Sequence, residues 1–224
     1  MTNSRNTAPG IILLGFMVLT IAPASFAADH VLTLAHKVDE HYNRLQTFQA
    51  EFTEIYRGIG VERTETGTLW LKRPHRMRWE YRTPHEKLFV TDGTDAWFYS
   101  PADRQARRAS FKKLEDLRSP LAFLLGKAKL ENELQGLSLA PDRAAKSAGN
   151  IVLRGVPKHL GQVTDVLLEV TPQGQIAGIR AEEADGATTE YWFTGMRENV
   201  PVAEERFRFR PPVGTEVVGG EFGQ

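Results

Sequence analysis

Apolar and polar residues alternate with a period of two along much of this chain, and the clearest case is residues 67–81, GTLWLKRPHRMRWEY. One side of this alternation is mostly apolar and aromatic, and it consists of Gly67, Leu69, Leu71, Arg73, His75, Met77, Trp79 and Tyr81. A period of two predicts β-strands with one apolar face. Arg73 is the exception, because it places a permanently charged guanidinium among leucines and a tryptophan.

Before this segment the apolar period changes from helical to extended. Apolar residues recur at steps of three and four in residues 31–45, which predicts an amphipathic helix with Asp29 as its N-cap. The apolar side of this helix consists of Val31, Leu34, Ala35, Val38, Tyr42 and Leu45. Residues 47–58 alternate instead, and residues 57–60 indicate a turn. One face of that strand carries Phe48, Ala50, Phe52 and Tyr56, with Glu54 as the exception.

The extended pattern returns several times toward the C-terminus. Residues 86–101 predict a β-hairpin, because two apolar runs flank Asp92-Gly93. Turn signals separate four further runs that predict strands, at residues 151–154, 163–170, 175–183 and 188–194. Phe207 and Phe209 predict a last short strand before two prolines.

Residues 111–135 break the extended pattern and predict a helical insert. Ser119 and Pro120 are typical of a helix start, and Gly126 is typical of a helix end. The five residues from Leu121 to Leu125 are all apolar, so this short helix must be covered on every side. It lies either against a hollow or a ligand, or it is an ordinary buried connector.

The order helix, strands, helical insert, strands predicts an α+β fold with one curved antiparallel sheet and helices on one face. The strands are rich in aromatic and aliphatic residues. Such a sheet can enclose a cavity as well as a core.

The N-terminal segment has the layout of a secretory signal peptide. Arg5 precedes a 12-residue apolar run at residues 11–22, and small residues follow it. This layout predicts a signal peptide over residues 1–27, cleavage between Ala27 and Ala28, and one mature domain over residues 28–224. A retained membrane anchor is the alternative, although the run is short for a membrane-spanning helix.

Charge and cysteine content narrow the possible functions. Without residues 1–27 the chain has 27 basic and 28 acidic residues, a net charge of −1, which does not suit a general nucleic-acid binder. An exported chain without cysteine has no disulfides, and it cannot itself carry the acylated cysteine of a lipoprotein. We therefore expect the mature protein to be soluble beyond the inner membrane.

Catalytic chemistry has little support in the sequence. There is no cysteine nucleophile, no G-x-S-x-G motif and no glycine-rich phosphate loop, and the six histidines are dispersed. We expect no enzyme activity, no cofactor and no metal site; His36 and His41 lie on different faces of their helix. A basic run is either a docking patch or, as we favour, a solvated loop, and it consists of Arg104, Arg107, Arg108, Lys112 and Lys113.

Several segments together resemble the LolA-type outer-membrane lipoprotein carriers. They are FQAEFTE, GTLWLKRPHRMRWEY, VTDGTDAWFYSP, RSPLAFLLG and FRFRPPVGTEVV, and they follow the order seen in that family. The resemblance runs from about residue 30 to about residue 217, with no match between Leu137 and Asn150. Its most specific parts are G-x-L-W-x-K-R-P followed by Trp79, and D-G-x-x-x-W-F-Y.

The resemblance implies a half-open antiparallel β-barrel with helices covering its concave face. It also implies a monomeric periplasmic carrier that takes acylated lipoproteins from an inner-membrane lipoprotein-releasing ABC transporter to an outer-membrane lipoprotein receptor. The residues that line the lipid-binding cavity would be Phe48, Phe52, Leu69, Leu71, Arg73, Met77, Trp79, Tyr81, Leu121, Phe123, Leu124 and Leu125. A carrier of another lipid such as a glycolipid, an envelope-stress lipid sensor and an envelope hydrolase are the alternatives.

Arg73 corresponds to the functional arginine of the family. A guanidinium donates up to five hydrogen bonds, and the ends of short lid helices leave carbonyls unpaired. Arg73 would therefore act as a latch that holds the lid over an empty cavity. The alternative is that Arg73 extends to solvent beside Pro74, where the strand is interrupted.

Overall fold

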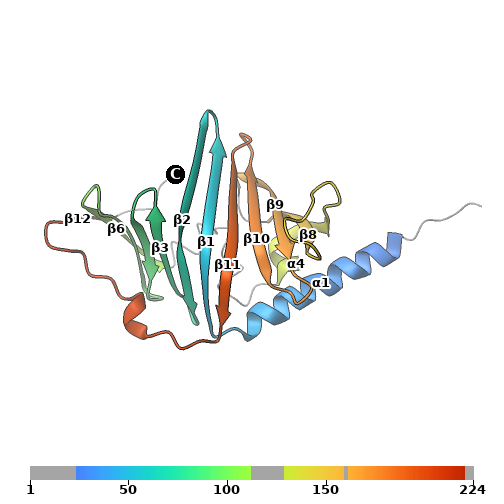
Figure 1. Cartoon of the computed structure of the whole chain (residues 1–224), viewed down its shortest axis with the longest axis horizontal. Coiled ribbons are helices and arrows are strands. Elements are labelled where there is room, and N and C mark those ends of the chain that lie inside the picture. Colours follow the sequence, from blue (N-terminus) through green and yellow to red (C-terminus); the bar gives the residue numbers. More distant parts are fainter. Residues whose placement is uncertain (1–23, 112–128, 159–160, 220–224) are drawn as a thin grey trace, which may run out of the picture.

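The computed structural model describes residues 24–111, 129–158 and 161–219, and one open β-sheet dominates them (Figure 1). Its twelve strands lie in the order β12-β6-β5-β4-β3-β2-β1-β11-β10-β9-β8-β7. All neighbouring strands are antiparallel except β12 and β6, which are parallel. Because β12 and β7 are the end strands of this order, the sheet is not closed.

The strands before residue 111 follow one another along the chain as neighbours in the sheet. They are β1 (Thr47–Gly58), β2 (Val61–Lys72), β3 (Arg76–Thr83), β4 (Lys87–Thr91), β5 (Asp95–Ser100) and β6 (Gln105–Ser110). The second half adds β7 (Leu134–Leu139), β8 (Ile151–Pro157), β9 (Val163–Val170), β10 (Ile176–Glu183), β11 (Thr188–Glu198) and β12 (Glu216–Gly219). Within the described ranges, the helical elements are α1 (Ala24–Arg44), the single turn α4 (Leu130–Glu133) and the 3₁₀ turn η1 (Glu204–Phe207).

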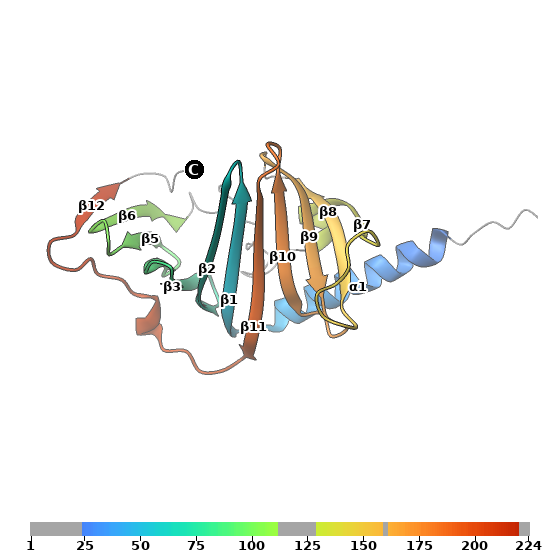
Figure 2. The ribbon, with the colours of Figure 1, turned by 45° about the horizontal axis from the view of Figure 1, so that its top comes forward.

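Helix α1 packs its apolar side on the half of the sheet that contains β7–β10 (Figures 1 and 2). All six apolar positions predicted for this helix are buried in the main core. The Tyr42 hydroxyl accepts a hydrogen bond from the Ile176 backbone N–H at 3.0 Å, and Asp39 accepts one from the Leu130 N–H at 2.9 Å. The predicted N-cap is wrong, because the helix begins at Ala24 and Asp29 lies inside it; the alanines around Asp29 favour helix.

The turn between β9 and β10 touches α1 directly. Gly174 has a φ of +88°, and a Cβ atom there would lie 2.6 Å from the Lys37 carbonyl oxygen. A glycine is therefore needed both for the left-handed backbone and for the close approach to the helix.

The segment 67–81 forms two strands and a turn. β2 ends at Lys72 and β3 begins at Arg76, so the alternation passes through a tight turn at residues 73–75. The two strands pair with Leu71 opposite Met77 and Leu69 opposite Trp79. Their apolar side chains therefore lie on one sheet face, which we call the α1 face because its residues share the main core with α1.

The opposite face of the sheet is covered in part by the C-terminal segment. Trp70 points to this face but is only 8% exposed, because it packs with Val202 and Phe207. The predicted last strand at residues 207–209 is wrong: Phe207 ends η1, and Phe209 packs against the rings of Trp97 and Tyr99 at 5.5 and 5.3 Å.

Three strands were not predicted, and the last of them is the short β12. Residues 105–110 form β6 rather than the expected solvated loop, although Arg107 and Arg108 are exposed on it. Residues 134–139 form β7, so the predicted helical insert ends before it with the single turn α4. The predicted hairpin at residues 86–101 is confirmed as β4 and β5, and the four later strands are confirmed as β8–β11.

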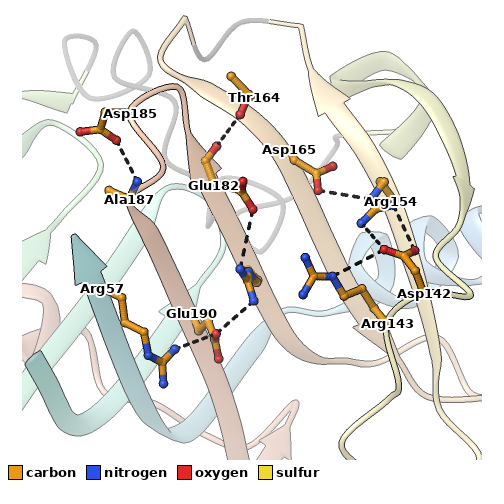
Figure 3. Close-up of polar contacts among 11 residues, drawn as sticks. Arg57, Asp142, Arg143, Arg154, Thr164, Asp165, Glu182, Asp185, Ala187 and Glu190 are labelled. Atoms are coloured by element: carbon orange, nitrogen blue, oxygen red, sulfur yellow. Dashed lines mark hydrogen bonds and ion pairs between the residues drawn. The ribbon is translucent and has the colours of Figure 1, made fainter. Parts of the chain in front are cut away.

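Away from the C-terminal segment, the opposite face is charged and paired (Figure 3). Arg57 contacts Glu190 at 2.9 Å, and Arg154 contacts both Asp142 and Asp165 at 3.1 and 3.2 Å. These pairs lie on β1, β11, β8 and β9 and the loop after β7. This part of the opposite face is therefore a polar surface on which these charges are paired with one another.

Two predictions concern parts of the chain that the structure does not describe. Residues 1–23, most of the predicted signal peptide, and residues 112–128, which include the predicted helix at 119–126, lie outside the described residues. Of the helices within the described ranges, none combines the length and apolar character needed to cross a membrane.

Candidate functional site

The central strands build a continuous apolar surface on the α1 face. Antiparallel register places side chains of β1, β2 and β3 in rows across the sheet. The first row is Phe48, Leu71 and Met77, the second is Ala50, Leu69 and Trp79, and the third is Phe52, Gly67 and Tyr81. Every residue predicted on these strands to line a cavity thus lies on one face, in three consecutive rows.

Aromatic rings fill the third row and connect it to β11. The Phe52 ring lies 4.7 Å from the Trp79 ring and 5.0 Å from the Tyr81 ring. A Cβ atom at Gly67 would lie 2.7 Å from the Phe52 ring, so glycine makes room for this packing. On the neighbouring strand β11, Phe193 lies opposite Phe52 and its ring is 6.4 Å from Trp79.

Arg73 lies at one end of these rows, just beyond Leu71. Its guanidinium donates to the backbone carbonyls of Tyr42 and Asn43, the latter at 3.3 Å. Both carbonyls belong to the last turn of α1, and that of Tyr42 also accepts a hydrogen bond from the Leu45 backbone N–H at 3.3 Å. A cation is also favoured at a helix C-terminus. Burial lowers the pKa of Arg73 below its usual range, and the side chain is half-buried rather than extended into solvent.

These contacts bear on the two readings of Arg73. The side chain binds helix-end carbonyls, as a latch requires, but they belong to α1. The short helix expected at residues 119–126 lies outside the described residues, as do Leu121, Phe123, Leu124 and Leu125. The latch therefore stays a prediction.

A cluster of polar side chains lies beyond the third row, at the end of the surface opposite Arg73. Glu54 and Glu65 are cross-strand partners on β1 and β2, and they are 8% and 3% exposed. The Tyr81 hydroxyl donates to Glu54 at 2.8 Å, and Lys87 lies 2.6 Å from Glu65. Burial raises the pKa of Glu54, and the hydrogen bond from Tyr81 opposes that rise only in part.

Sequence reasoning noted Glu54 as an exception and missed Glu65. Extending the alternation of residues 67–81 back by two positions would have placed Glu65 on the apolar side. The turn predicted at residues 57–60 would then have paired it with Glu54. The described residues contain no group of three or more histidine or acidic side chains placed to hold a metal ion.

Comparison with known proteins assigns the family. Residues 43–210 match the family model described as outer membrane lipoprotein carrier protein LolA. This chain belongs to the LolA family.

Individual LolA relatives match over most of their length. The outer-membrane lipoprotein carrier protein of Sodalis glossinidius is 29% identical over 89% of this chain and 91% of that protein. The protein of the same name from Chromobacterium violaceum is 27% identical over 92% of this chain and 98% of its own length. A solved structure of a conserved protein from Thermus thermophilus has a TM-score of 0.50 at 14% identity, over 86% of this chain and 99% of that one, which supports the fold alone.

Proposed function

We propose that this LolA-family chain carries acylated lipoproteins across the periplasm by burying their acyl chains on the α1 face. The observation that supports this role is the three apolar rows on β1, β2 and β3. They form a continuous hydrocarbon surface, with Arg73 at one end. In the complete carrier, helices would cover this face as the concave side of a half-open barrel.

Transfer of a lipoprotein between membranes needs such a surface. Burying one methylene group is worth about 0.8 kcal/mol, so several acyl chains hold a lipoprotein in its membrane. A carrier must cover its apolar face when empty, because exposed apolar surface aggregates. The proposed role needs no covalent chemistry: the chain would receive cargo from an inner-membrane ABC transporter and release it to an outer-membrane receptor.

The Arg73 contacts suggest how the face is kept closed without cargo. We propose that Arg73 ties the end of α1 to the turn between β2 and β3 in the empty carrier. Entry of acyl chains would break these bonds and leave a half-buried guanidinium short of acceptors. Bound cargo would then be held less tightly than its apolar area alone gives, and this allows release.

The direct test is capture of cargo from membranes. The mature chain, signal peptide removed, is incubated with inner-membrane vesicles that contain the releasing transporter, and bound material is identified by mass spectrometry. We expect acylated protein. Recovery of free glycolipid alone would contradict this cargo and favour a carrier of another lipid. Recovery of no lipid-bearing molecule would contradict the carrier role.

A pair of variants tests whether the predicted short helix takes part. Leu124→Asp puts a charge on a helix expected to be apolar all round, so capture should fall at least tenfold while export and folding persist. Val213→Asp makes the same kind of change at a fully exposed residue and should capture as wild type does. Equal capture by both folded variants would rule out the helix as a cover for acyl chains.

A further inference from the structure

The apolar rows on the α1 face end abruptly at a fourth row of a different character. Back along β2 from Leu71, every second residue reads Leu71, Leu69, Gly67 and Glu65. Along β1, Phe52 is followed on the same face by Glu54, and Tyr191 of β11 lies opposite Glu54. One step along the sheet thus separates an aromatic row from two buried carboxylates.

The fourth row is a complete hydrogen-bonded network. Tyr81 donates to Glu54 at 2.8 Å, and Tyr191 lies opposite Glu54 on β11. Glu65 is held by Lys87 at 2.6 Å and by Arg63 at 3.2 Å. In the part of the chain that the structure describes, no buried side-chain nitrogen or oxygen lacks a partner. The network is therefore rigid, and Lys87 and Arg63 already supply the cations that Glu65 would otherwise attract.

This arrangement is not one that core packing alone would favour. Like charges directly opposite each other on a sheet are destabilising, and buried carboxylates lose their hydration. Apolar side chains of similar volume would extend the core at less cost. The polar character of these residues is therefore better explained by a function at the end of the apolar surface than by packing.

We infer that the fourth row, Glu54, Glu65 and Tyr191 with the bound Tyr81, Lys87 and Arg63, is a polar stop that sets how far acyl chains extend along the α1 face. The inference rests on the proposed carrier function and adds a preference for acyl-chain length. The apolar positions from Leu71 to Gly67 span about 14 Å along β2, at about 3.4 Å per residue. A chain that lies along them gains apolar contact up to Gly67 and Phe52. Beyond that point it meets the Lys87–Glu65 ion pair and gains none.

The expected signature is a break in the dependence of affinity on chain length. Each added methylene should raise affinity about fourfold while the chain lies on apolar rows. Once chain ends reach the fourth row, further methylenes should leave affinity unchanged. The probe is a series of synthetic diacylated lipopeptides, from octanoyl to octadecanoyl, titrated into the mature chain and followed by tryptophan fluorescence.

Two variants remove the stop without leaving polar partners unpaired. Glu54→Leu with Tyr81→Phe and Tyr191→Phe makes the row apolar on β11, β1 and β3. Glu65→Leu with Lys87→Leu removes the ion pair as a unit, and Arg63 is exposed enough to be solvated. In each variant the fourfold gain per methylene should continue to longer chains, so that the ratio of octadecanoyl to octanoyl affinity exceeds the wild-type ratio at least tenfold.

The control is Glu62→Leu, which replaces an exposed carboxylate on the other face of β2 and should keep the wild-type break. If both folded multiple variants break at the wild-type length, the polar stop is wrong while the carrier function stands. If wild type binds no probe of any length, acyl binding and the stop are both wrong.

Discussion

At the scale of single residues, Arg73 is a cation whose acceptors are backbone carbonyls rather than carboxylates. A carboxylate would hold the guanidinium through charge, whereas carbonyls at a helix end hold it through geometry and a partial dipole. In the proposed latch, this contact would be made in the empty carrier and broken when cargo enters.

The variant Arg73→Leu separates binding from release. It removes the bonds to Tyr42 and Asn43 and makes the end of the rows apolar, so bound acyl chains gain about 1–3 kcal/mol relative to wild type. We expect capture to persist and transfer to receptor-bearing liposomes to fall by at least tenfold. Arg82→Leu, on the opposite face of β3 beside Glu51, is the matched control. Transfer by Arg73→Leu at the wild-type rate would show that Arg73 is only structural.

Glu54 should make the stability of the folded protein depend on pH. Its pKa is raised in the folded state, so its favourable contribution is present below the unfolded pKa and is lost as pH rises through the folded value. Glu54→Gln has no charge to bury and can still accept from Tyr81. The variant should therefore resemble wild type at pH 4 and become the more stable protein toward pH 7. Urea midpoints at both pH values test this, and a difference that shrinks with rising pH would contradict it.

At the scale of elements, the position of α1 depends on a contact with the turn between β9 and β10. Gly174→Ala should be costly for two reasons: the left-handed backbone, and a Cβ atom 2.6 Å from the Lys37 carbonyl oxygen. Gly186→Ala shares the first reason, with a φ of +86°, but has no atom within 4 Å of the new Cβ. Both variants should lose about 1 kcal/mol from strain, and Gly174→Ala about 1–3 kcal/mol more from displacing the helix.

Urea unfolding of the two glycine variants measures that difference directly. Because α1 carries the carbonyls that bind Arg73, the displacement should also weaken the closed state. Equal stability of the two variants would mean that α1 moves away from the turn at no cost.

At the scale of the whole molecule, the segment after β11 fastens the β2–β6 half from the opposite face (Figure 2). Glu204 binds Lys72 and Arg76 at 2.6 and 3.0 Å, and Phe207 is buried against Trp70. Phe207→Ala should lower the free energy of unfolding by about 3–5 kcal/mol. Val213→Ala, at a fully exposed side chain, should change it by less than about 0.5 kcal/mol. A small loss at Phe207 in calorimetry would mean that this segment is not part of the cooperative unit.

The sequence predicts a strand correctly where its apolar residues are buried within that strand. It fails where the apolar residues of a segment pack on a distant element. β1, β2 and β8–β11 were predictable because each contains a run of apolar residues that are buried within its own strand. The pattern at Phe207 and Phe209 gave a wrong prediction because these rings pack on the surface of the sheet. Phe207 packs on Trp70 of β2, and Phe209 packs on Trp97 and Tyr99 of β5. β6 and β7 escaped prediction because they lie near the two edges of the sheet, where few side chains are buried.

The candidate site divides in the same way. Phe48, Phe52, Leu69 and Trp79 were predictable as one face because period and face are linked in any strand. The acceptors of Arg73 were not, because Tyr42 and Asn43 lie about thirty positions away and meet it only through the fold. Glu65 was not predicted as a site residue because a single charged residue in an apolar alternation has no evident meaning. Its meaning becomes clear only when its cross-strand partner is known.

An open sheet has a consequence for behaviour at high concentration, since each end strand offers unpaired backbone donors and acceptors to other chains. One end of this sheet is β12, only four residues long and paired in parallel, which makes it a poor template. The other is β7, whose pairing with β8 is interrupted between Gln135 and Ser138, with Gly136 at a φ of +65°. A short strand at one edge and an irregular strand at the other should both disfavour edge-to-edge pairing between copies of the protein. The sheet can then stay open without aggregating through its edges.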